Sequence, residues 1–599
     1  MKLNNKLSSL LILIGLIFIG CDDVLDKDEL AAISNEQVWD DENLAEGFLN
    51  EIYDRGLSGW SNGASGLSDD AQGANSVMYG EVNSSSKNSY GGTYGAIKNI
   101  NLLLANVGTG ALPEDFQNSL IAQSLFFRAK HYFSLVSTYG GVPLVLELND
   151  LNDELEIPRN KTSECINQII IDLDKAITGL PSSYDDAGSD YGRITKGAAM
   201  AFKAKVLLFY ASEQFDPSQS EGRWQAAYEA VSTAKTYLEG QGKGLYPDYA
   251  ELWFDESDSN SEAIIIRRYT TDKTHSRDVG VRPFVTGTSG ESWDKPSIGI
   301  AEAYPMKDGK AIDDATSSYS YDTTVFWENR DPRFNANIAR NGALFSLNDP
   351  APQTTSDLVW TFVESQIEAG ADERISPSAL LCKKAVDGSI AGGGDTYNGT
   401  TDWIEMRFAE VLLFFAESAN EIGKTSEAYD ALIKIRTRAG IEAGTGFYGL
   451  KEGMDKDEMR TAIMLERRLE LVFEGKRSSD LRRRRMYSTL NGTHRKGYVI
   501  ERTAAFDALD PSDEVLDDRK ALENGVLDGS IDLSDPTVYN TYFTTVLTSL
   551  ERDGNTLVDG ISIDYQDKYY FFDLPQGALN SNPKLVQTEG WGGTFDPLQ

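Results

Sequence analysis

Residues 465–485 read LERRLELVFEGKRSSDLRRRR, a stretch in which apolar residues alternate with charges of both signs. Its apolar residues Leu465, Leu469, Val472 and Phe473 recur at spacings that predict one face of a helix. Opposite charges also stand three or four residues apart, where they are neighbours on a helix surface: Arg467 with Glu470, Glu474 with Arg477, and Asp480 with Arg484. Spacing alone therefore predicts an amphipathic helix whose charged side is solvated and carries ordinary ion pairs.

The composition is that of a folded and strongly acidic protein. The chain has 599 residues, of which 40% are hydrophobic and 10% aromatic, as in globular proteins. Its formal net charge of −37 repels nucleic acid and anionic membrane surfaces, which favours a protein partner or a neutral or cationic ligand. We therefore expect the basic run Arg482–Arg485 to take part in structural ion pairs and not in nucleic-acid binding.

The N-terminal segment is predicted to direct the chain to a membrane. Two lysines precede the apolar run Leu7–Ile19, which has the length of a signal-peptide core and is shorter than the about 20 residues that span a bilayer. The run ends in Phe-Ile-Gly-Cys, which looks like a bacterial lipoprotein cleavage box. Residues 1–20 are thus the predicted signal peptide and Cys21 the predicted lipid attachment site. A plain secretory signal that happens to precede a cysteine is the alternative.

Amphipathic patterns over much of the remaining chain predict paired helices. Residues 122–145, AQSLFFRAKHYFSLVSTYGGVPLV, carry a broad apolar stripe that ends at Gly140, Gly141 and Pro143. Other helical patterns cover Glu36–Tyr53, Gly91–Val107, Ser163–Leu180, Thr195–Phe215, Gly222–Leu238, Trp403–Glu421, Thr425–Ala439 and Met459–Phe473. Such pairs are similar to tetratricopeptide hairpins, which stack into a superhelix because no single pair buries its apolar face.

The middle of the chain differs from these helical parts. Residues 246–402 are rich in Gly, Ser, Asp, Thr and aromatic residues, with strand-like runs such as Ala263–Tyr269. We expect an N-terminal helical region at 21–245, an irregular insertion at 246–402 that carries the ligand loops, and a C-terminal region at 403–599. The predicted fold class is therefore mostly α: a tetratricopeptide-like helical superhelix with a long, irregular, loop-rich insertion.

Five motifs, in the same order along the chain, resemble those of the SusD/RagB family, which are surface lipoproteins of Bacteroidota. They are the helix ending in Tyr-Gly-Gly-Val-Pro-Leu-Val at 139–145, PSIGIAEAYPMKDGK at 296–310, Arg-Asp-Pro-Arg at 330–333, RRLELVFEGKRSSDLRR in the opening stretch, and the tail Tyr569–Trp591 with its Leu-Pro, Asn-Pro and Gly-Trp pairs. Asp22 and Asp23, directly after Cys21, resemble the surface-export signal of such lipoproteins. The resemblance covers nearly the whole chain.

The resemblance implies a lipid-anchored, surface-exposed protein of the outer membrane. Such a protein binds oligosaccharides or polysaccharides and caps a SusC-like TonB-dependent transporter as a lid, with no catalysis and no cofactor. A receptor for peptides or another nutrient in the same kind of complex is one alternative. A surface glycoside hydrolase is another, since that chemistry needs only two carboxylates and the chain has 93 acidic residues.

A glycan-binding site needs aromatic faces on which sugars stack, and polar groups for their hydroxyls. Five aromatic residues in polar, loop-like contexts are expected to form it: Trp60, Trp293, Tyr319, Tyr321 and Trp360. For each of them taken singly, ordinary packing is the alternative. The acidic runs Asp255–Glu262 and Asp510–Asp518 leave calcium binding open, so the metal ligands stay unassigned.

Overall fold

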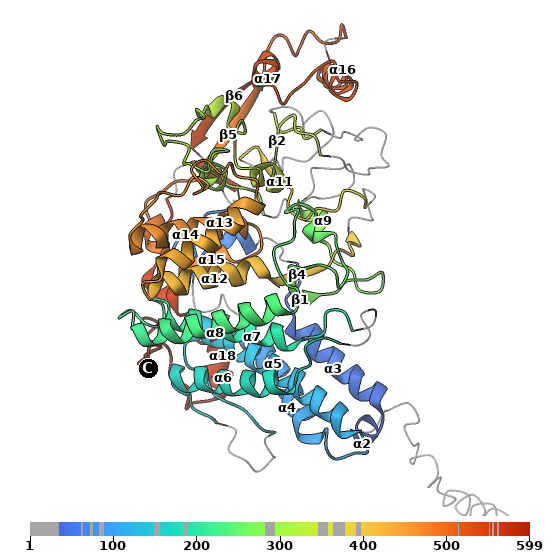
Figure 1. The fold of residues 1–599 in the computed structure, drawn as a ribbon, viewed down its shortest axis with the longest axis vertical. Coiled ribbons are helices and arrows are strands. Elements are labelled where there is room, and N and C mark those ends of the chain that lie inside the picture. The colour runs from blue at the N-terminus through green and yellow to red at the C-terminus, as the bar shows by residue number, and fades with distance from the viewer. Residues whose placement is uncertain are drawn as a thin grey trace, which may run out of the picture.

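Paired helices form the scaffold of the described part of the chain (Figure 1). Of the 599 residues, the computed structural model describes residues 35–60, 64–71, 76–82, 89–148, 156–184, 188, 190–281, 294–345, 358–362, 378–390, 397–512, 514–549, 551–553, 556–559 and 562–599. The longer helices are α3 (Glu42–Gly56), α4 (Ser89–Asn106), α5 (Glu114–Tyr139), α6 (Thr162–Gly179), α7 (Lys196–Ala211), α8 (Glu221–Gly240), α12 (Phe408–Glu421), α13 (Thr425–Arg438) and α14 (Lys456–Glu470). The mostly helical class is confirmed.

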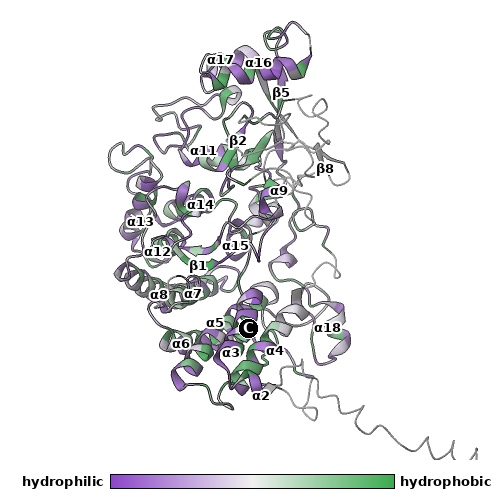
Figure 2. Ribbon diagram, turned by 90° about the vertical axis from the view of Figure 1, so that its right-hand side faces the viewer, coloured by the Kyte–Doolittle hydropathy of each residue, from purple (hydrophilic) through white to green (hydrophobic). Residues whose placement is uncertain are grey.

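The array runs without a break from the N-terminal helices to the C-terminal ones. Helix α5 packs against α4 and α6, α7 packs against α8, and α12 packs against α8, α13 and α14. In Figures 1 and 2 the helices α3 to α8 lie below α12 to α15, and the strands β5 and β2 lie at the other end of the long axis with α16 and α17. Two helical groups that are far apart in sequence thus form one continuous scaffold.

Short elements complete the fold at the two ends of this scaffold. The short helices are α2 (Asn35–Val38), α9 (Arg277–Val281), α10 (Ile298–Ala303), α11 (Arg333–Asn337), α15 (Arg477–Arg483), α16 (Val515–Leu527), α17 (Pro536–Tyr542) and α18 (Gln576–Ser581). The strands pair antiparallel in twos: β1 (Ala263–Arg267) with β4 (Trp403–Arg407), β2 (Ile338–Arg340) with β3 (Leu380–Cys382), β5 (Lys496–Arg502) with β6 (Phe543–Ser549), and β7 (Glu551–Asp553) with β8 (Thr556–Asp559).

One predicted helix is in fact a strand followed by a helix. The pattern over Trp403–Glu421 predicted helix throughout, but residues 403–407 form β4 and only residues from Phe408 onward form α12. Strand β4 pairs with β1 and joins Ala263 to Arg407, so the two edges of the expected insertion lie side by side. The expected boundaries at residues 245 and 402 stay a prediction.

The opening stretch is two helices and not one. Helix α14 ends at Glu470, and α15 begins at Arg477. Between them Phe473 and Gly475 adopt positive φ values of 59° and 69°, which an α-helix cannot contain. The apolar spacing correctly marked the buried side, because Leu469, Val472 and Phe473 are all buried.

The charges of this stretch are buried and pair over long distances, which corrects the predicted solvated surface and its local pairs. Glu470 accepts hydrogen bonds from Arg407 Nη1 at 2.6 Å and Arg333 Nη1 at 2.9 Å. Glu474 pairs with Lys384 Nζ at 2.6 Å and also with Arg407. Although burial raises it, the surrounding cations hold the pKa of the Glu470 carboxyl well below its usual range. Removing one member of such a buried network leaves an unpaired charge inside the protein, which strongly destabilises the fold.

The basic run that follows is structural, as predicted. Arg483 binds Glu417 with both terminal nitrogens, at 2.6 and 2.7 Å, and Asp480 with Nε at 2.8 Å. Arg484 reaches Glu421 at 3.0 Å. These arginines therefore fix α15 against α12 from inside the protein.

Two hydrophobic cores meet at α14. The larger core fills the helical array and includes Met459 and Ile463, while the second core, under β2, β3, β5 and β6, includes Leu469 and Val472. The tail of the chain returns to the first core: the Arg159 guanidinium lies 3.6 Å from the Phe595 ring centroid, and residues 597 and 599 accept hydrogen bonds from residues 162 and 163. Among the described helices, none has the length and apolar content needed to cross a membrane.

Candidate functional site

The five aromatic residues expected to bind a ligand do not gather in one place. Trp60 has only 8% of its surface exposed and packs against Trp253 and Trp403, with its indole N–H donated to Thr401 O at 2.7 Å. The Arg277 guanidinium covers the ring at 4.5 Å. The expectation that Trp60 stacks on a sugar is therefore corrected: its faces are occupied by core packing.

The other four residues lie at different points of the molecule or outside the described part. Tyr319 donates to Glu442 Oε1 at 2.7 Å, and the Tyr321 hydroxyl lies 3.4 Å from that of Tyr498. Trp360 packs beside Phe543 at the edge of the second core. Trp293 and the lipidation residue Cys21 lie outside the described residues.

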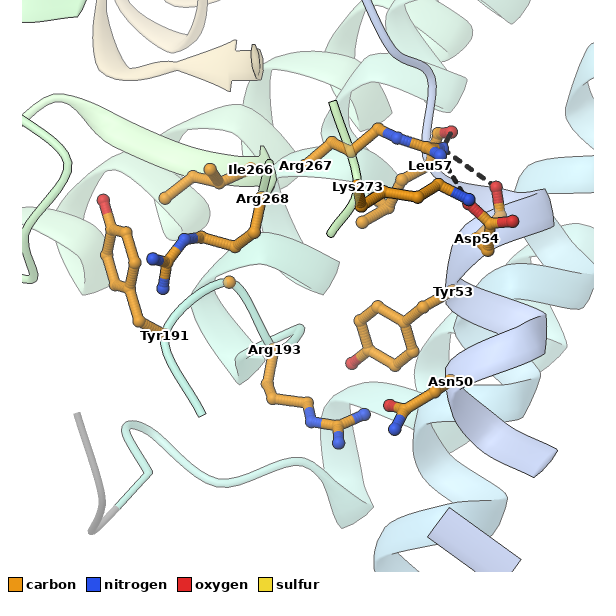
Figure 3. A pocket seen from close by; sticks show the side chains of 11 residues that line it. Asn50, Tyr53, Asp54, Leu57, Tyr191, Arg193, Ile266, Arg267, Arg268 and Lys273 are labelled. Carbon is orange, nitrogen blue, oxygen red and sulfur yellow. Dashed lines mark hydrogen bonds and ion pairs between the residues drawn. The ribbon is translucent and has the colours of Figure 1, made fainter. Parts of the chain in front are cut away.

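A different set of residues forms a pocket of about 460 Å³ between α3, the loop before α7, and the end of β1 (Figure 3). This volume is in the range of small-molecule sites. Its lining is Asn50, Tyr53, Asp54, Leu57, Tyr191, Gly192, Arg193, Ile266, Arg267, Arg268 and Lys273. Two tyrosines, one amide and several charged groups thus face one space.

The local structure explains how these side chains converge. Asn50, Tyr53 and Asp54 are three or four residues apart on α3, so they share one helix face. Their helix begins at Glu42, and the side chain of the preceding Asp41 accepts hydrogen bonds from residues 43 and 44 as an N-cap. Gly192 has φ of +95°, which turns the loop between Tyr191 and its neighbour Arg193. Both flanking side chains therefore line the pocket.

One wall of the pocket is a charged cluster around Asp54. Arg267 and Lys273 both pair with this carboxylate, the lysine at 2.9 Å, as the dashed lines in Figure 3 show. Arg267 also donates to Leu57 O at 2.7 Å. Burial raises the pKa of Asp54, but the two cations outweigh it and lower the pKa, so the carboxylate is ionised at neutral pH.

The opposite wall holds Tyr191 and Arg268. The Arg268 guanidinium lies 4.9 Å from the ring centroid of Tyr191, a cation–π contact, and its Nε is 2.9 Å from Asp402. Burial raises the pKa of Asp402 to about 7, against the lowering effect of Arg268. The charge next to Arg268 therefore changes near neutral pH.

Tyr53 and Arg193 form the floor. The Tyr53 hydroxyl donates to Gln123 Oε1 at 2.5 Å and accepts from the Ile194 N–H at 2.9 Å, so its ring is fixed. Burial raises the pKa of Tyr53 far above its usual value, so the hydroxyl stays protonated. The Arg193 guanidinium stands 5.0 Å from the centroid of that ring and pairs with Glu46 at 2.5 Å.

A second hollow of about 260 Å³ continues the first one. The two share Tyr191, Gly192, Arg193 and Ile266, and the second adds two aromatic side chains, Tyr184 and Tyr237. Tyrosine rings alternating with arginine, aspartate and asparagine groups suit a polar ligand with several hydroxyls, such as a saccharide. The described residues contain no group of three or more His, Cys, Asp or Glu side chains placed to hold a metal ion.

Sequence reasoning missed this pocket because its residues come from three separate segments. Tyr53 lies in a helical pattern, and Arg267 and Arg268 end a strand-like run, so each looks structural on its own. The available signal was the Arg-Arg-Tyr sequence at 267–269, in which two adjacent cations follow an apolar strand. Nothing in the sequence placed that strand end next to α3.

Comparison with known proteins shows the same family over both halves of the chain. The model described as the SusD family matches residues 261–591, and one described as starch-binding associating with outer membrane matches residues 32–208. The chain is 26% identical to SusD-like protein P2 of Formosa agariphila, over 77% of this chain and 83% of that protein.

Solved structures share the fold. A SusD-like protein of Bacteroides fragilis matches with a TM-score of 0.68 at 23% identity, over 92% of this chain and 98% of that one. A SusD-like carbohydrate-binding protein of the same species gives 0.66 at 19% identity, over 92% and 100%. A laminarin-binding SusD-like protein gives 0.55 at 20% identity, over 92% and 99%.

Proposed function

The chain belongs to the SusD family, and on this basis we propose that it captures oligosaccharides at the cell surface and delivers them to a SusC-like TonB-dependent transporter. As a member of this family it is a binding protein and not an enzyme. The observation that carries the proposal is the family match over residues 261–591, joined by the outer-membrane-associated match over residues 32–208.

The pocket of Figure 3 supports the ligand part of this proposal. Its tyrosine rings line the space next to arginine side chains, and these arginines and Asp54 offer directed hydrogen-bonding groups. The continuation past Tyr184 and Tyr237 gives room for more than one sugar unit. Two similar solved proteins are described as carbohydrate-binding and laminarin-binding, which agrees with the same ligand class here.

We place the anchor at Cys21 and the transporter against the helical scaffold. Acyl chains on a cysteine hold a protein to a bilayer by about 0.8 kcal/mol per buried CH₂ group. Labelling of growing cells with a radioactive fatty acid should mark the wild type and not Cys21→Ser. Cross-linking in intact outer membranes, followed by mass spectrometry, should recover a TonB-dependent barrel protein. Recovery of no barrel protein would contradict the delivery role.

The binding role is tested by affinity electrophoresis of the chain from residue 22 in gels that contain plant, algal or fungal polysaccharides. We expect one class of polysaccharide to retard the protein. Tyr191→Ala should abolish the retardation because it removes a wall of the pocket, whereas Tyr397→Ala, at an exposed tyrosine outside the pocket, should not. No retardation by any polysaccharide, together with binding of a peptide mixture, would favour the peptide-receptor alternative.

The partly exposed Tyr319 and Tyr321 are proposed as a second contact point for long glycans, and Trp293 and Trp360 stay proposed as separate contacts. Tyr319 and Tyr321 share the loop before Trp327, so one double variant tests them. Changing both to Ala should weaken binding of a polysaccharide and leave binding of a short oligosaccharide unchanged. If the double variant bound the polysaccharide with the same affinity as wild type, Tyr319 and Tyr321 would not contact long glycans.

A further inference from the structure

We propose that the pocket of Figure 3 selects saccharides that carry an anionic group, either a carboxylate or a sulfate. This inference rests on the proposed glycan-binding function and names the ligand class of that same site. It also departs from the expectation drawn from the net charge, which favoured a neutral or cationic ligand.

The lining of the pocket has the opposite charge to the protein as a whole. It contains four cations, Arg193, Arg267, Arg268 and Lys273, and one carboxylate, Asp54. The whole chain has 56 basic and 93 acidic residues. Because salt screens charges beyond about 8 Å at physiological ionic strength, a ligand inside the pocket responds to the lining more than to the distant acidic surface.

Two of the cations are half-buried and held in fixed positions. The side chains of Arg193 and Arg267 are only 12% and 16% exposed. Glu46 holds the first, while Asp54 and two backbone carbonyls hold the second. Fixed guanidinium groups lose little freedom on binding, so they provide preorganised positive groups in the floor and in one wall.

The other two cations are within reach of a ligand. The side chains of Arg268 and Lys273 are 37% and 56% exposed. Arg268 uses Nε toward Asp402 and directs its planar fork to the space beside Tyr191 (Figure 3). Such a fork matches the two oxygens of a carboxylate or sulfate. Lys273 shares the single carboxylate of Asp54 with Arg267, so this wall keeps a net positive charge.

The remaining carboxylates near these cations lie outside the lining of this pocket. Glu46 and Asp190 contact Arg193, and Asp402 contacts Arg268 with a side chain that is only 4% exposed. Glu46 and Asp402 line neither hollow, whereas Asp190 lines the second one, so the cationic lining is that of the first pocket, with four cations and one carboxylate. An aromatic wall at Tyr191 beside this cationic lining fits a sugar ring whose substituent is charged.

The test uses matched pairs of polysaccharides. Polygalacturonate is compared with its carboxyl-reduced form, and a sulfated galactan with its desulfated form, by isothermal titration with the chain from residue 22. We expect at least one charged polymer to bind at least about tenfold more tightly than its neutral counterpart, with an affinity that falls as salt is added. The two pairs distinguish a carboxylate from a sulfate.

Variants assign the effect to this pocket. Lys273→Gln removes an exposed lining cation and should weaken binding about tenfold, whereas Lys520→Gln, at a similarly exposed lysine on α16, should not. Asp54→Asn removes the one lining carboxylate and should strengthen binding, which simple structural damage would not do. Circular dichroism checks that each variant is folded.

Three results would overturn the inference. Binding of neutral glycans without preference for the charged form would overturn it and leave the proposed function intact. Binding of charged glycans that is unaffected by Lys273→Gln and Asp54→Asn would show that another surface is responsible. Binding of no saccharide at all would remove the proposed function as well.

Discussion

At the scale of single residues, we expect Asp402 to make the stability of the protein depend on pH. Its carboxylate is buried, accepts the Tyr269 N–H at 2.8 Å and faces Arg268, and burial raises its pKa from about 3.8 to about 7. The folded protein therefore holds this proton more tightly than the unfolded chain does. The contribution to stability is full below about pH 4 and is lost as the pH rises through 7.

Asp402→Asn removes this titration. Relative to wild type, the free energy of unfolding of the variant should increase as the pH rises from 5 to 8, since only the wild type loses stability through this group. Urea unfolding of both proteins at the two pH values measures the difference. A difference that does not change with pH would show that Asp402 is ionised in the folded protein throughout.

Glu470 represents the buried charges of the opening stretch. Glu470→Gln keeps the shape but leaves Arg333, Arg407 and Arg438 with one negative charge fewer, so it should lower the free energy of unfolding by about 3–5 kcal/mol. The control Glu51→Gln breaks an exposed pair with Arg55 and should change it by about 1 kcal/mol or less. Equal effects of the two changes in urea unfolding would contradict the structural role of the network.

Single-residue roles were the least accessible from the sequence. Trp60 stands among glycines and serines and looked exposed, but segments at 253, 277 and 403 cover it. Burial of this kind depends on contacts between distant segments, about which composition carries no information. Trp224 and Trp403, by contrast, lie in segments whose predicted helical pattern already indicated a buried apolar face, and both are buried, although Trp403 lies in a strand.

At the scale of elements, α14 is positioned by a capping box. The Asp455 carboxylate accepts the N–H groups of residues 457 and 458, at 3.0 and 2.9 Å, and Glu458 accepts the Asp455 N–H in return at 3.0 Å. Asp455→Ala should therefore lower the free energy of unfolding by about 1 kcal/mol. Asp455→Ser keeps an accepting oxygen and should recover most of the loss. Urea unfolding in which both variants equal wild type would show that the cap is not needed.

Helix positions followed from periodicity, but helix ends and the strand at 403–407 did not. Periodicity indicates which face of a segment is apolar. The apolar pattern continues from residue 403 to residue 421 without a glycine or proline that would mark a break. The pairing of β4 with β1, which lies far away in sequence, decides the strand. The end of α14 at Glu470 was missed for a similar reason. Gly475 was the single residue that indicated a break, and the strong apolar pattern before it predicted a continuous helix.

At the scale of the whole molecule, α14 joins the two hydrophobic cores, so we expect them to unfold together. Met459 and Ile463 belong to one core, and Leu469 belongs to the other. Hydrogen exchange measured by mass spectrometry at increasing urea should show α5 and β5 losing protection at the same concentration. Loss of protection in β5 well before α5 would show two independent units.

The overall class and the family were accessible from the sequence because helical periodicity and spaced motifs extend along the whole chain. The pocket was not, since it forms where α3 meets the end of β1, at residues more than 200 positions apart. The positive charge of the pocket lining could not be inferred either, because the net charge of −37 describes the whole chain and not a single site.

The return of the tail to the first helices has a consequence for biosynthesis. Arg159 and the start of α6 complete their contacts only with residues 595–599, which the ribosome adds more than 400 residues later. These contacts of the first helical pairs therefore form only after residues 595–599 have been made. For a chain that we propose to be exported, we expect these contacts to form only after residues 595–599 have followed the N-terminal part through the secretion channel.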